Sequence, residues 1–255
     1  MLAITRLNAI KEIIRQQKSV LVSELAPRFD VTEETIRRDL KKLEDEGLVT
    51  RVYGGAYSTG GVQNDVNISL RQTILVDEKR AIACRCLSSI TNGDCIFLDC
   101  STTVLELAQL LTQYSLTVIT NSLKVADCLA TCNDIRLILV GGTLHHTSMS
   151  FLGQNACSAL ANYYVDKAFV SCRSLSIRHG ITDSNEEQSL LRRVAIQSSD
   201  QVFLLADHTK FDTTSFSKIA TLDEISTLVT DRPLSPEWKE YMDSKGFCYI
   251  DTDLV

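Results

Sequence analysis

Short apolar segments alternate with helical stretches from residue 75 to residue 255, and this alternation restricts the fold more than any other feature of the sequence. The predicted strands span residues 95–98, 117–120, 136–140, 168–172, 202–206 and 226–229, and the predicted helices span residues 77–90, 103–112, 122–130, 151–163 and 186–197. A β–α–β succession of this kind favours a mostly parallel sheet with helices on both faces. We therefore predict an α/β domain over residues 75–255.

The beginning of the chain has a different pattern. In a helix predicted over residues 3–17, Leu7, Ile10 and Ile14 share one face and Arg6 lies on another. A short helix is predicted near residues 23–29. We place Pro27 in its first turn, where a missing N–H has no partner to lose.

A third helix and a strand pair follow. Thr32 is predicted to cap the helix, which stops at Gly47, and residues 48–53 alternate like a strand that turns at Gly54–Gly55. Three helices and a hairpin within so short a segment indicate a winged helix-turn-helix domain over residues 1–57. Residues 58–74, which begin with small and polar side chains, are predicted to link the two domains.

Charge is divided unevenly along the chain. The whole chain has 26 Lys and Arg against 32 Asp and Glu, which gives a net charge of −6. Residues 1–57 carry ten basic and nine acidic side chains, whereas the rest carries 16 and 23. Nucleic-acid binding is therefore expected only of the N-terminal domain.

Several classes of protein are excluded by composition. The apolar runs are far shorter than the roughly 20 residues of a membrane-spanning helix, and Arg6 and Lys11 interrupt the N-terminus, so we expect neither a membrane segment nor a signal peptide. The nine Cys lack metal-binding spacing and are expected to be reduced core residues of a cytoplasmic protein. We predict no metal ion and no cofactor.

The third helix has a basic stripe opposite its apolar one. With Ile36, Leu40 and Leu43 facing the core, the outward and flanking positions are held by Thr35, Arg37, Arg38, Lys41 and Lys42. Such a helix fits a DNA major groove, where Arg binds guanine or phosphate and Thr binds either. The pattern alone is equally consistent with a solvated charged face.

Several motifs around this helix resemble the DeoR family of bacterial transcription regulators. They are Ser-Glu-Leu at residues 23–25, Val-Thr-Glu-Glu-Thr-Ile-Arg-Arg-Asp-Leu at 31–40, Leu-Glu at 43–44, Gly-Leu at 47–48, Arg51 and Gly-Gly-Ala at 54–56. The resemblance continues to the end of the chain. The predicted DNA-binding residues are Ser23, Thr32, Thr35, Arg37, Arg38, Lys41, Lys42 and Arg51.

The resemblance implies a winged helix followed by a C-terminal sensor domain, similar in fold to ribose-5-phosphate isomerase and the coenzyme A transferases. It also implies a repressor of a sugar-catabolism operon that a phosphorylated sugar releases from its operator DNA. Because one winged helix covers few base pairs, we expect a homo-oligomer, dimer or tetramer, assembled through the larger domain.

Loops after the predicted strands carry the polar residues of the acidic domain. The carboxyl ends of parallel strands are where open α/β sheets bind ligands. Hydroxyls and N–H groups at helix starts bind phosphate, Lys210 adds a positive charge, and carboxylates accept hydrogen bonds from sugar hydroxyls. The predicted effector-binding residues are Asp99, Ser101, Thr102, Thr103, Thr120, Asn121, Ser122, Gly141, Gly142, Arg173, Glu187, Asp207 and Lys210.

Two of these loops resemble family motifs, with departures. Residues 207–211 resemble Asp-x-[Ser/Thr]-Lys-Phe-Gly, with Asp212 in place of the final Gly, and residues 180–187 resemble Gly-[Leu/Ile]-Thr-x-x-Asn-x-Glu. Cys100 stands where the family has Gly, so the sequence leaves open how closely this loop approaches a phosphate.

Two other functions stay open at this point. One is a sugar-phosphate isomerase with an appended winged helix, in which Asp207 and Lys210 move protons. The other is a redox switch at Cys100. An isomerase does not need the DNA-reading module, and no second carboxylate is clearly paired with Asp207. The sequence therefore favours a regulator that is not an enzyme.

Overall fold

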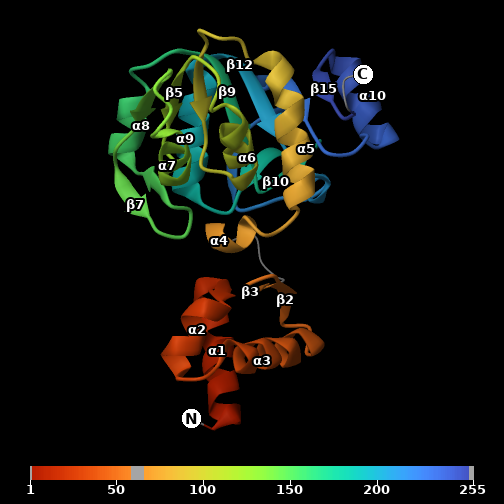
Figure 1. The fold of residues 1–255 in the computed structure, drawn as a ribbon. Helices are drawn as coiled ribbons and strands as arrows, with labels where there is room; N and C mark the ends of the chain where they lie inside the picture. The colour runs from red at the N-terminus through yellow and green to blue at the C-terminus, as the bar shows by residue number, and fades with distance from the viewer. Residues whose placement is uncertain (1, 59–65, 253–255) are drawn as a thin grey trace. The chain divides into compact units, whose positions relative to one another are not determined.

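The computed structural model describes residues 2–58 and 66–252 (Figure 1). The chain forms two compact units, which meet in the sequence between Val76 and Asp77. Part of the predicted linker, residues 59–65, lies outside the described residues, and the predicted domain limits stay predictions. No helix in the described part of the chain has the length and apolar character needed to cross a membrane.

The N-terminal unit packs three helices against a small antiparallel sheet. Helices α1 (Ala3–Gln17), α2 (Val22–Phe29) and α3 (Glu33–Asp45) share one apolar core. Strands β1 (Ser19–Leu21), β2 (Val49–Val52) and β3 (Gly55–Ser58) pair in the order β1-β3-β2. This arrangement confirms the predicted winged helix-turn-helix fold.

The positions of Arg6 and Pro27 were predicted wrongly. Arg6 lies one turn before Ile10 and shares its buried face, where its Nε donates to Asp39 Oδ2 at 2.6 Å. Pro27 is the sixth residue of α2, beyond the first turn. The carbonyl that loses its N–H partner belongs to Ser23, an exposed residue, which accounts for the tolerance of this proline.

The predicted turn of the wing is displaced by one residue. Gly54 has a φ of +90°, a conformation that favours glycine, whereas Gly55 already pairs in β3. A Cβ at Gly55 would lie 2.1 Å from the carbonyl oxygen of Val20. Gly54 therefore allows the turn, and Gly55 allows β1 to approach β3 closely.

A short helix, α4 (Ile68–Arg71), lies inside the predicted linker and packs on the N-terminal unit. The backbone N–H of Asn67 donates to Ser19 Oγ at 3.0 Å, and the Thr73 hydroxyl donates to the carbonyl of Tyr53 at 3.0 Å. The described part of this segment is therefore held against the winged helix and is not an extended tether.

The C-terminal unit is built on a seven-stranded sheet in which all neighbours are parallel. The strand order is β15-β14-β12-β9-β4-β5-β6. The strands span Cys95–Leu98 (β4), Leu116–Thr120 (β5), Ile135–Leu139 (β6), Val165–Ser171 (β9), Ser199–Leu205 (β12), Thr227–Val229 (β14) and Cys248–Ile250 (β15). The predicted parallel sheet is confirmed, and β15 is an addition to it.

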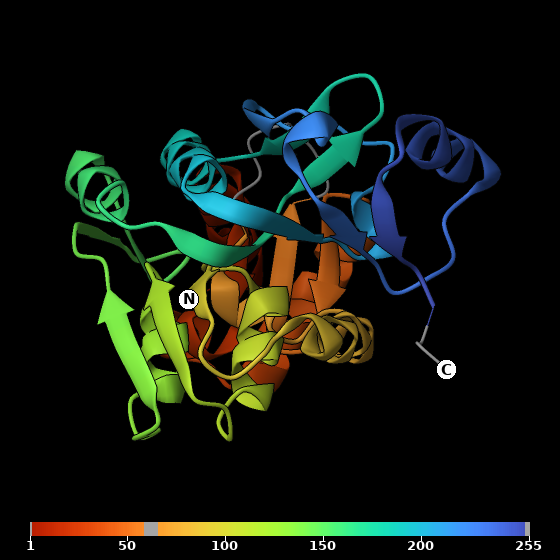
Figure 2. The same cartoon turned by 90° about the horizontal axis from the view of Figure 1, so that it is seen from above.

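Helices cover both faces of this sheet, as Figure 2 shows. Helices α5 (Val76–Cys86), α6 (Thr102–Leu110) and α7 (Leu123–Leu129) pack with Ile96 and Leu98 of β4. Helices α8 (Gln154–Leu160), α9 (Glu186–Gln197) and α10 (Pro236–Lys245) pack with Phe97 of the same strand. Because side chains alternate along a strand, one continuous apolar run supplies two cores.

Several elements were not predicted. Strands β10 (Ser174–Ser176), β11 (Gly180–Asp183) and β13 (Ser217–Ala220) form a second sheet, and β7 (Thr143–His145) pairs with β8 (Ser150–Leu152). The helix predicted over 151–163 starts only at Gln154, because β8 occupies its first residues. These strands have three or four residues and polar side chains, so they lack the apolar alternation that identifies a strand.

Candidate nucleic-acid interface and effector site

Helix α3 presents its basic residues to solvent. The Thr32 hydroxyl accepts from the backbone N–H of Thr35 at 3.3 Å and starts the helix as predicted. Ile36, Leu40 and Leu43 are buried against α1 and α2, which fixes the rotation of the helix. Seven of the eight predicted DNA-binding residues are exposed, namely Ser23, Thr32, Arg37, Arg38, Lys41, Lys42 and Arg51, and Thr35 is half-buried.

Each arginine of this surface is paired with a glutamate of α3. Arg37 lies 2.5 Å from Glu33, and Arg38 lies 3.3 Å from Glu34, one turn earlier in each case. Exposed pairs of this kind exchange readily with other anions, because water screens them. The ion pairs therefore hold both arginines along the helix surface, and either arginine can leave its glutamate for another anion.

Arg51 of the wing makes two hydrogen bonds to a single glutamate of α3. Its Nε lies 2.7 Å from Glu44 Oε2, and its backbone N–H donates to Glu44 Oε1 at 3.0 Å. These two hydrogen bonds from Arg51 hold the pKa of Glu44 below its ordinary value. Glu44 thus ties the end of α3 to β2 and sets where Arg51 lies, a role that the sequence analysis did not assign to it.

Apart from Glu187, which follows β11, the predicted effector residues lie at the carboxyl edge of the seven-stranded sheet, because its strands are all parallel. Hydrogen bonds connect neighbouring strand ends at this edge. The Thr120 hydroxyl donates to the carbonyl of Leu98 at 2.7 Å, and the Ser171 hydroxyl donates to the carbonyl of Leu205 at 2.6 Å. The loops that follow β4, β5, β9 and β12 are therefore held together as one edge.

Asp99 is the centre of a buried charge cluster. Its Oδ1 accepts from the Ser101 N–H at 2.8 Å, and its Oδ2 accepts from the Ser171 N–H at 3.0 Å and from Arg192 Nε at 2.7 Å. Arg192 also donates to Asp183 Oδ2 at 2.7 Å. Burial lowers the pKa of Arg192, but the two carboxylates outweigh it, so the pKa is raised and the guanidinium stays charged.

This cluster gives Asp99 protein partners that the sequence analysis did not predict. Both of its carboxylate oxygens already accept hydrogen bonds from the protein, and the residue is only 1% exposed. The arrangement favours a structural role, in which Asp99 fixes the loop that starts α6. Asp183 and Arg192 were not among the predicted site residues, although the sequence motif at 180–187 contains the first of them.

At the start of α6, one side chain caps the helix and two others are buried. The Ser101 hydroxyl accepts from the N–H of Val104 at 3.1 Å, and Thr102 and Thr103 are buried. Cys100 does not have a positive φ, so the glycine of the family motif is not needed here for backbone conformation. Its thiol lies 3.9 Å from Gln188 Oε1 of α9, another residue that the sequence analysis missed.

The loop after β5 contains a buried acceptor without a donor. The Ser122 hydroxyl caps α7 by accepting from the N–H of Val125 at 3.2 Å. Asn121 Nδ2 donates to the carbonyl of Phe151 at 3.2 Å, which fixes the orientation of the amide. Asn121 Oδ1 is buried and has no hydrogen-bond donor within the described residues. An unpaired buried acceptor is costly, so this oxygen marks a position suited to a ligand donor.

Gly142 is required by packing. A Cβ at this position would lie 2.5 Å from the carbonyl oxygen of Leu152 in β8, whereas nothing lies within 4 Å of a Cβ at Gly141. The hairpin β7–β8 closes against the β6 end at Gly142. Packing therefore explains the glycine at this position without a ligand, and the predicted role of Gly142 in ligand approach stays a prediction.

The loop after β12 is held at successive residues. Asp207 accepts from the backbone N–H of Thr209 at 3.0 Å, and Lys210 Nζ lies 3.9 Å from Asp207 Oδ2. Burial raises the pKa of Asp207, but Lys210, the hydrogen bonds from Thr209, and Lys79 outweigh burial and hold the pKa below its ordinary value. The carboxylate is thus a stable counter-charge beside Lys210.

The departure from the family motif at Asp212 also has a structural explanation. Asp212 has a φ of +57°, which glycine adopts freely and Asp tolerates. Its Oδ1 accepts from Trp238 Nε1 at 2.9 Å. The preceding Phe211 packs edge-on against Trp238, with the two ring centroids 5.0 Å apart. Asp212 therefore accepts a hydrogen bond from Trp238 that a glycine at this position could not accept.

Two predicted residues lie apart from these hydrogen-bonded loops. Glu187 is exposed in the first turn of α9, and Arg173 is half-buried after β9. The cysteines form no disulfide among the described residues. Burial raises the pKa of the Cys172 thiol to about 12, which keeps it protonated and unreactive near neutral pH.

Comparison with known domains assigns both units. Residues 6–60 match the DeoR-like helix-turn-helix domain, and residues 75–232 match the DeoR C-terminal sensor domain. The chain is 42% identical to the uncharacterized HTH-type transcriptional regulator YulB of Bacillus subtilis over 245 residues, which cover 96% of this chain and 95% of the relative. The chain belongs to the DeoR family of transcriptional regulators.

Other DeoR-family relatives align over nearly their whole length. The HTH-type transcriptional repressor GlcR of Bacillus subtilis is 36% identical, with 97% of this chain and 96% of the relative covered. The lactose phosphotransferase system repressor of Staphylococcus epidermidis is 32% identical, with 89% and 91% covered. A solved D-ribose-5-phosphate isomerase is 12% identical, covers 53% of this chain and 54% of its own, and has a TM-score of 0.41.

Membership of the DeoR family confirms the resemblance recognised in the sequence. The DNA-binding and effector-binding residues themselves stay predictions. The structure adds Glu44, Asp183, Gln188 and Arg192 to the residues that shape the two candidate sites. No cluster of three or more His, Cys, Asp or Glu side chains suited to a metal ion was found among residues 2–58 and 66–252.

Proposed function

We propose that this DeoR-family protein is a repressor of a carbohydrate-catabolism operon, bound to its operator through α3 and the wing and released by a phosphorylated sugar. The observation that carries the proposal is the joint presence, in one chain, of an exposed basic helix and a polar, parallel-sheet edge with Lys210 at its rim. The names of GlcR and of the lactose phosphotransferase system repressor support a sugar-linked role.

In this proposal the exposed arginines of α3 exchange partners when DNA binds. Arg37 and Arg38 leave Glu33 and Glu34 for phosphate or guanine, while Arg51 keeps Glu44 as an orienting partner. Lys41 and Lys42 add phosphate contacts. Operator affinity should then fall steeply as salt rises, because each phosphate contact releases counterions.

The effector is proposed to enter with its phosphate toward Lys210 and the start of α6. The net −7 of residues 58–255 does not prevent this, because charges beyond about 8 Å are screened at physiological salt. Asn121 Oδ1 is the acceptor proposed for a sugar hydroxyl, and its burial requires the β5 loop to move before a hydroxyl reaches it. An acceptor at one end and an ammonium at the other suit a phosphorylated polyol.

The enzyme alternative is less well supported. Asp207 is paired with Lys210 and Thr209, and the other nearby carboxylates, Asp99 and Asp183, are bound to Arg192. No carboxylate described here is thus placed as a second proton-transfer group for Asp207. Incubation with ribose 5-phosphate tests this point, because turnover would favour the isomerase.

Oligomerisation through the sensor domain is also proposed, since two winged helices related by symmetry read a repeated half-site. Light scattering at micromolar concentration should give a mass well above the 28.3 kDa of one chain. A monomer at that concentration would contradict the proposal.

The decisive experiment is operator release measured by gel shift with a panel of sugar phosphates and the corresponding free sugars. Release by one or more phosphorylated members, and not by their free sugars, is expected. Lys210→Ala should bind the operator and resist release. Lys218→Ala, an exposed lysine of β13, is the matched control and should respond like the parent. Equal response to both forms of a sugar would rule out phosphate recognition.

A further inference from the structure

Helix α5 is attached near both of its ends to the segment that follows β14. Glu78 Oε1 lies 3.9 Å from Arg232 Nη2, and the Arg85 guanidinium donates to the carbonyl of Thr230. Both contacts reach residues 230–232, which come directly after β14. One side of α5 is therefore fixed to the carboxyl end of a strand that neighbours β12.

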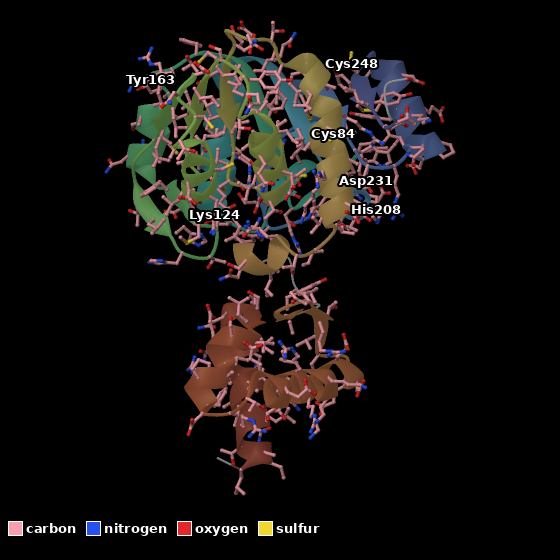
Figure 3. The ribbon with its side chains drawn as sticks, in the orientation of Figure 1. Cys84, Lys124, Tyr163, His208, Asp231 and Cys248 are labelled. Carbon is pink, nitrogen blue, oxygen red and sulfur yellow. The ribbon has the colours of Figure 1, made fainter. Side chains whose placement is uncertain are left out.

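The same segment holds the loop that carries Lys210. The side chain of Asp231 is buried, and its two oxygens accept from His208: Oδ1 from the backbone N–H and Oδ2 from Nδ1, each at 2.7 Å. Figure 3 shows His208 and Asp231 beside each other. Arg232 Nε lies 3.5 Å from Asp231 Oδ2. The contacts thus run in series from Glu78 through Arg232 and Asp231 to His208.

A second connection runs through Lys79. This residue is only 6% exposed, which is uncommon for lysine and requires compensation by nearby polar or acidic groups. Lys79 contributes, with Lys210, to the lowered pKa of Asp207, so its ammonium lies within electrostatic range of that carboxylate. Two consecutive residues of α5 therefore act on the 207–210 loop: Glu78 through Arg232 and Asp231, and Lys79 through Asp207.

We infer that the first turn of α5 belongs to the effector site, where Lys79 and the Glu78–Arg232–Asp231–His208 series position the 207–210 loop and transmit its occupancy. The inference rests on the proposed function. A phosphate that approaches Lys210 competes with Asp207 for the ammonium, and Asp207 then shifts its interaction toward Lys79. Because α5 starts where the sensor unit joins the N-terminal unit in the sequence, this shift reaches the segment that leads to the DNA-binding helices.

The test separates effector binding from coupling. The coupling factor is the ratio of effector dissociation constants measured by calorimetry with and without saturating operator duplex, with the sugar phosphate that releases the parent most strongly as the probe. A parent factor of about 5–150 is typical of allosteric proteins. Arg232→Gln and Lys79→Met should lower it to within about twofold of unity, while Arg232→Gln still binds the probe.

Arg80→Gln is the matched control, because it removes one positive charge from an exposed position of the same helix turn. It should keep the parent coupling factor. Coupling that survives in Arg232→Gln, a variant at an exposed position, would overturn the inference even if Lys79→Met fails to fold.

A measurement without any effector keeps the inference separate from the proposed function. Hydrogen exchange of the α5 amides in the Arg232→Gln protein, with no sugar present, should be several-fold faster than in the parent and in Arg80→Gln. Unchanged exchange would show that the ion-pair series does not hold α5. If no sugar phosphate binds the parent, the proposed function fails, whereas faster exchange would still show that the series positions α5.

Discussion

The charges of α3 and those beneath the effector loops are arranged in opposite ways. On α3, Arg37 and Arg38 are paired with glutamates one turn away, and all four side chains are at least half exposed. In the sensor domain, Arg192 lies between Asp99 and Asp183, and all three side chains are less than 10% exposed. The first set can exchange partners with a ligand, whereas the second holds the protein in shape.

Solvent exposure sets the energetic difference. Exposed ion pairs contribute at most about 1 kcal/mol, so their loss or exchange hardly changes the free energy of folding. Removal of one partner from a buried pair costs about 3–5 kcal/mol, because a charge is left without compensation. Residues that bind DNA should therefore tolerate substitution in stability assays, and residues of the buried cluster should not.

The largest effect is expected for Arg192→Ala. Removal of the guanidinium leaves Asp99 and Asp183 buried with no cation between them, and the free energy of unfolding should fall by about 3–5 kcal/mol. Urea denaturation followed by circular dichroism measures this loss. The loop that starts α6 should also become more accessible to proteolysis, because Asp99 holds it.

Arg193→Ala is the neighbouring control. Arg193 donates to the carbonyls of Ile219 and Lys218 and is not part of the buried charge cluster, so its loss should cost about 1 kcal/mol. Similar losses for both variants would show that the buried cluster has no special weight, and the contrast with α3 would fail.

The next effect concerns DNA and leaves stability unchanged. If Arg38 contacts a base, Arg38→Ala should weaken operator binding by about 1–3 kcal/mol, while its unfolding curve stays close to that of the parent. Gel shifts with operator and with unrelated duplex measure the affinity and the selectivity. Arg15→Ala, which removes an exposed and similarly paired arginine from α1, should leave both unchanged. Parent-like operator affinity in Arg38→Ala would remove this residue from the interface.

A smaller effect is expected from the protonation of Asp207. Its pKa in the folded protein lies below the ordinary value for aspartate, so its contribution to stability is fully present above the unfolded-state pKa and is lost as the pH falls through the lower folded-state pKa. Asp207→Asn lacks this contribution. The difference in free energy of unfolding between parent and variant, measured by urea titration from pH 7 to pH 3, should therefore shrink below pH 4. A difference that does not change with pH would contradict the pairing of Asp207 with Lys210.

The sequence predicted the parallel sheet well because its strands have a distinctive pattern. A strand buried on both faces, such as β4 or β12, is a continuous apolar run that few other structures need. The three-residue strands β7, β8 and β10 have no such run, although each pairs with a strand close to it in the sequence. Such short strands carry too few residues for a pattern to identify them, and β13 (residues 217–220) pairs with β11 (residues 180–183) from a distant part of the sequence.

The sequence predicted which loops come together at the candidate effector site, but not which buried side chains those loops bind. Loops after parallel strands converge by topology, so Asp207 and Asn121 could be assigned to one edge. Whether an Asp faces a ligand or a buried Arg depends on a distant helix, and nothing in the residues around Asp99 signals Arg192. The same reason hid Asp231, which lies 23 residues from His208. Charged partners that come from separate elements become visible only in three dimensions.

The smallest effect is expected for Glu34→Gln, and it tests whether the α3 pairs are exchangeable. Glu34 lies 3.3 Å from Arg38 with both side chains largely exposed, so the stability of the variant should change by less than about 0.5 kcal/mol. Operator affinity should rise by a few fold, because Arg38 no longer leaves a partner and one negative charge near the phosphates is gone. Thermal unfolding and gel shifts check the two values, with Glu24→Gln on α2 as the exposed control. A loss of stability above about 1 kcal/mol would show that the Arg38–Glu34 pair stabilises the fold, as the buried cluster does, and is not free to exchange with DNA.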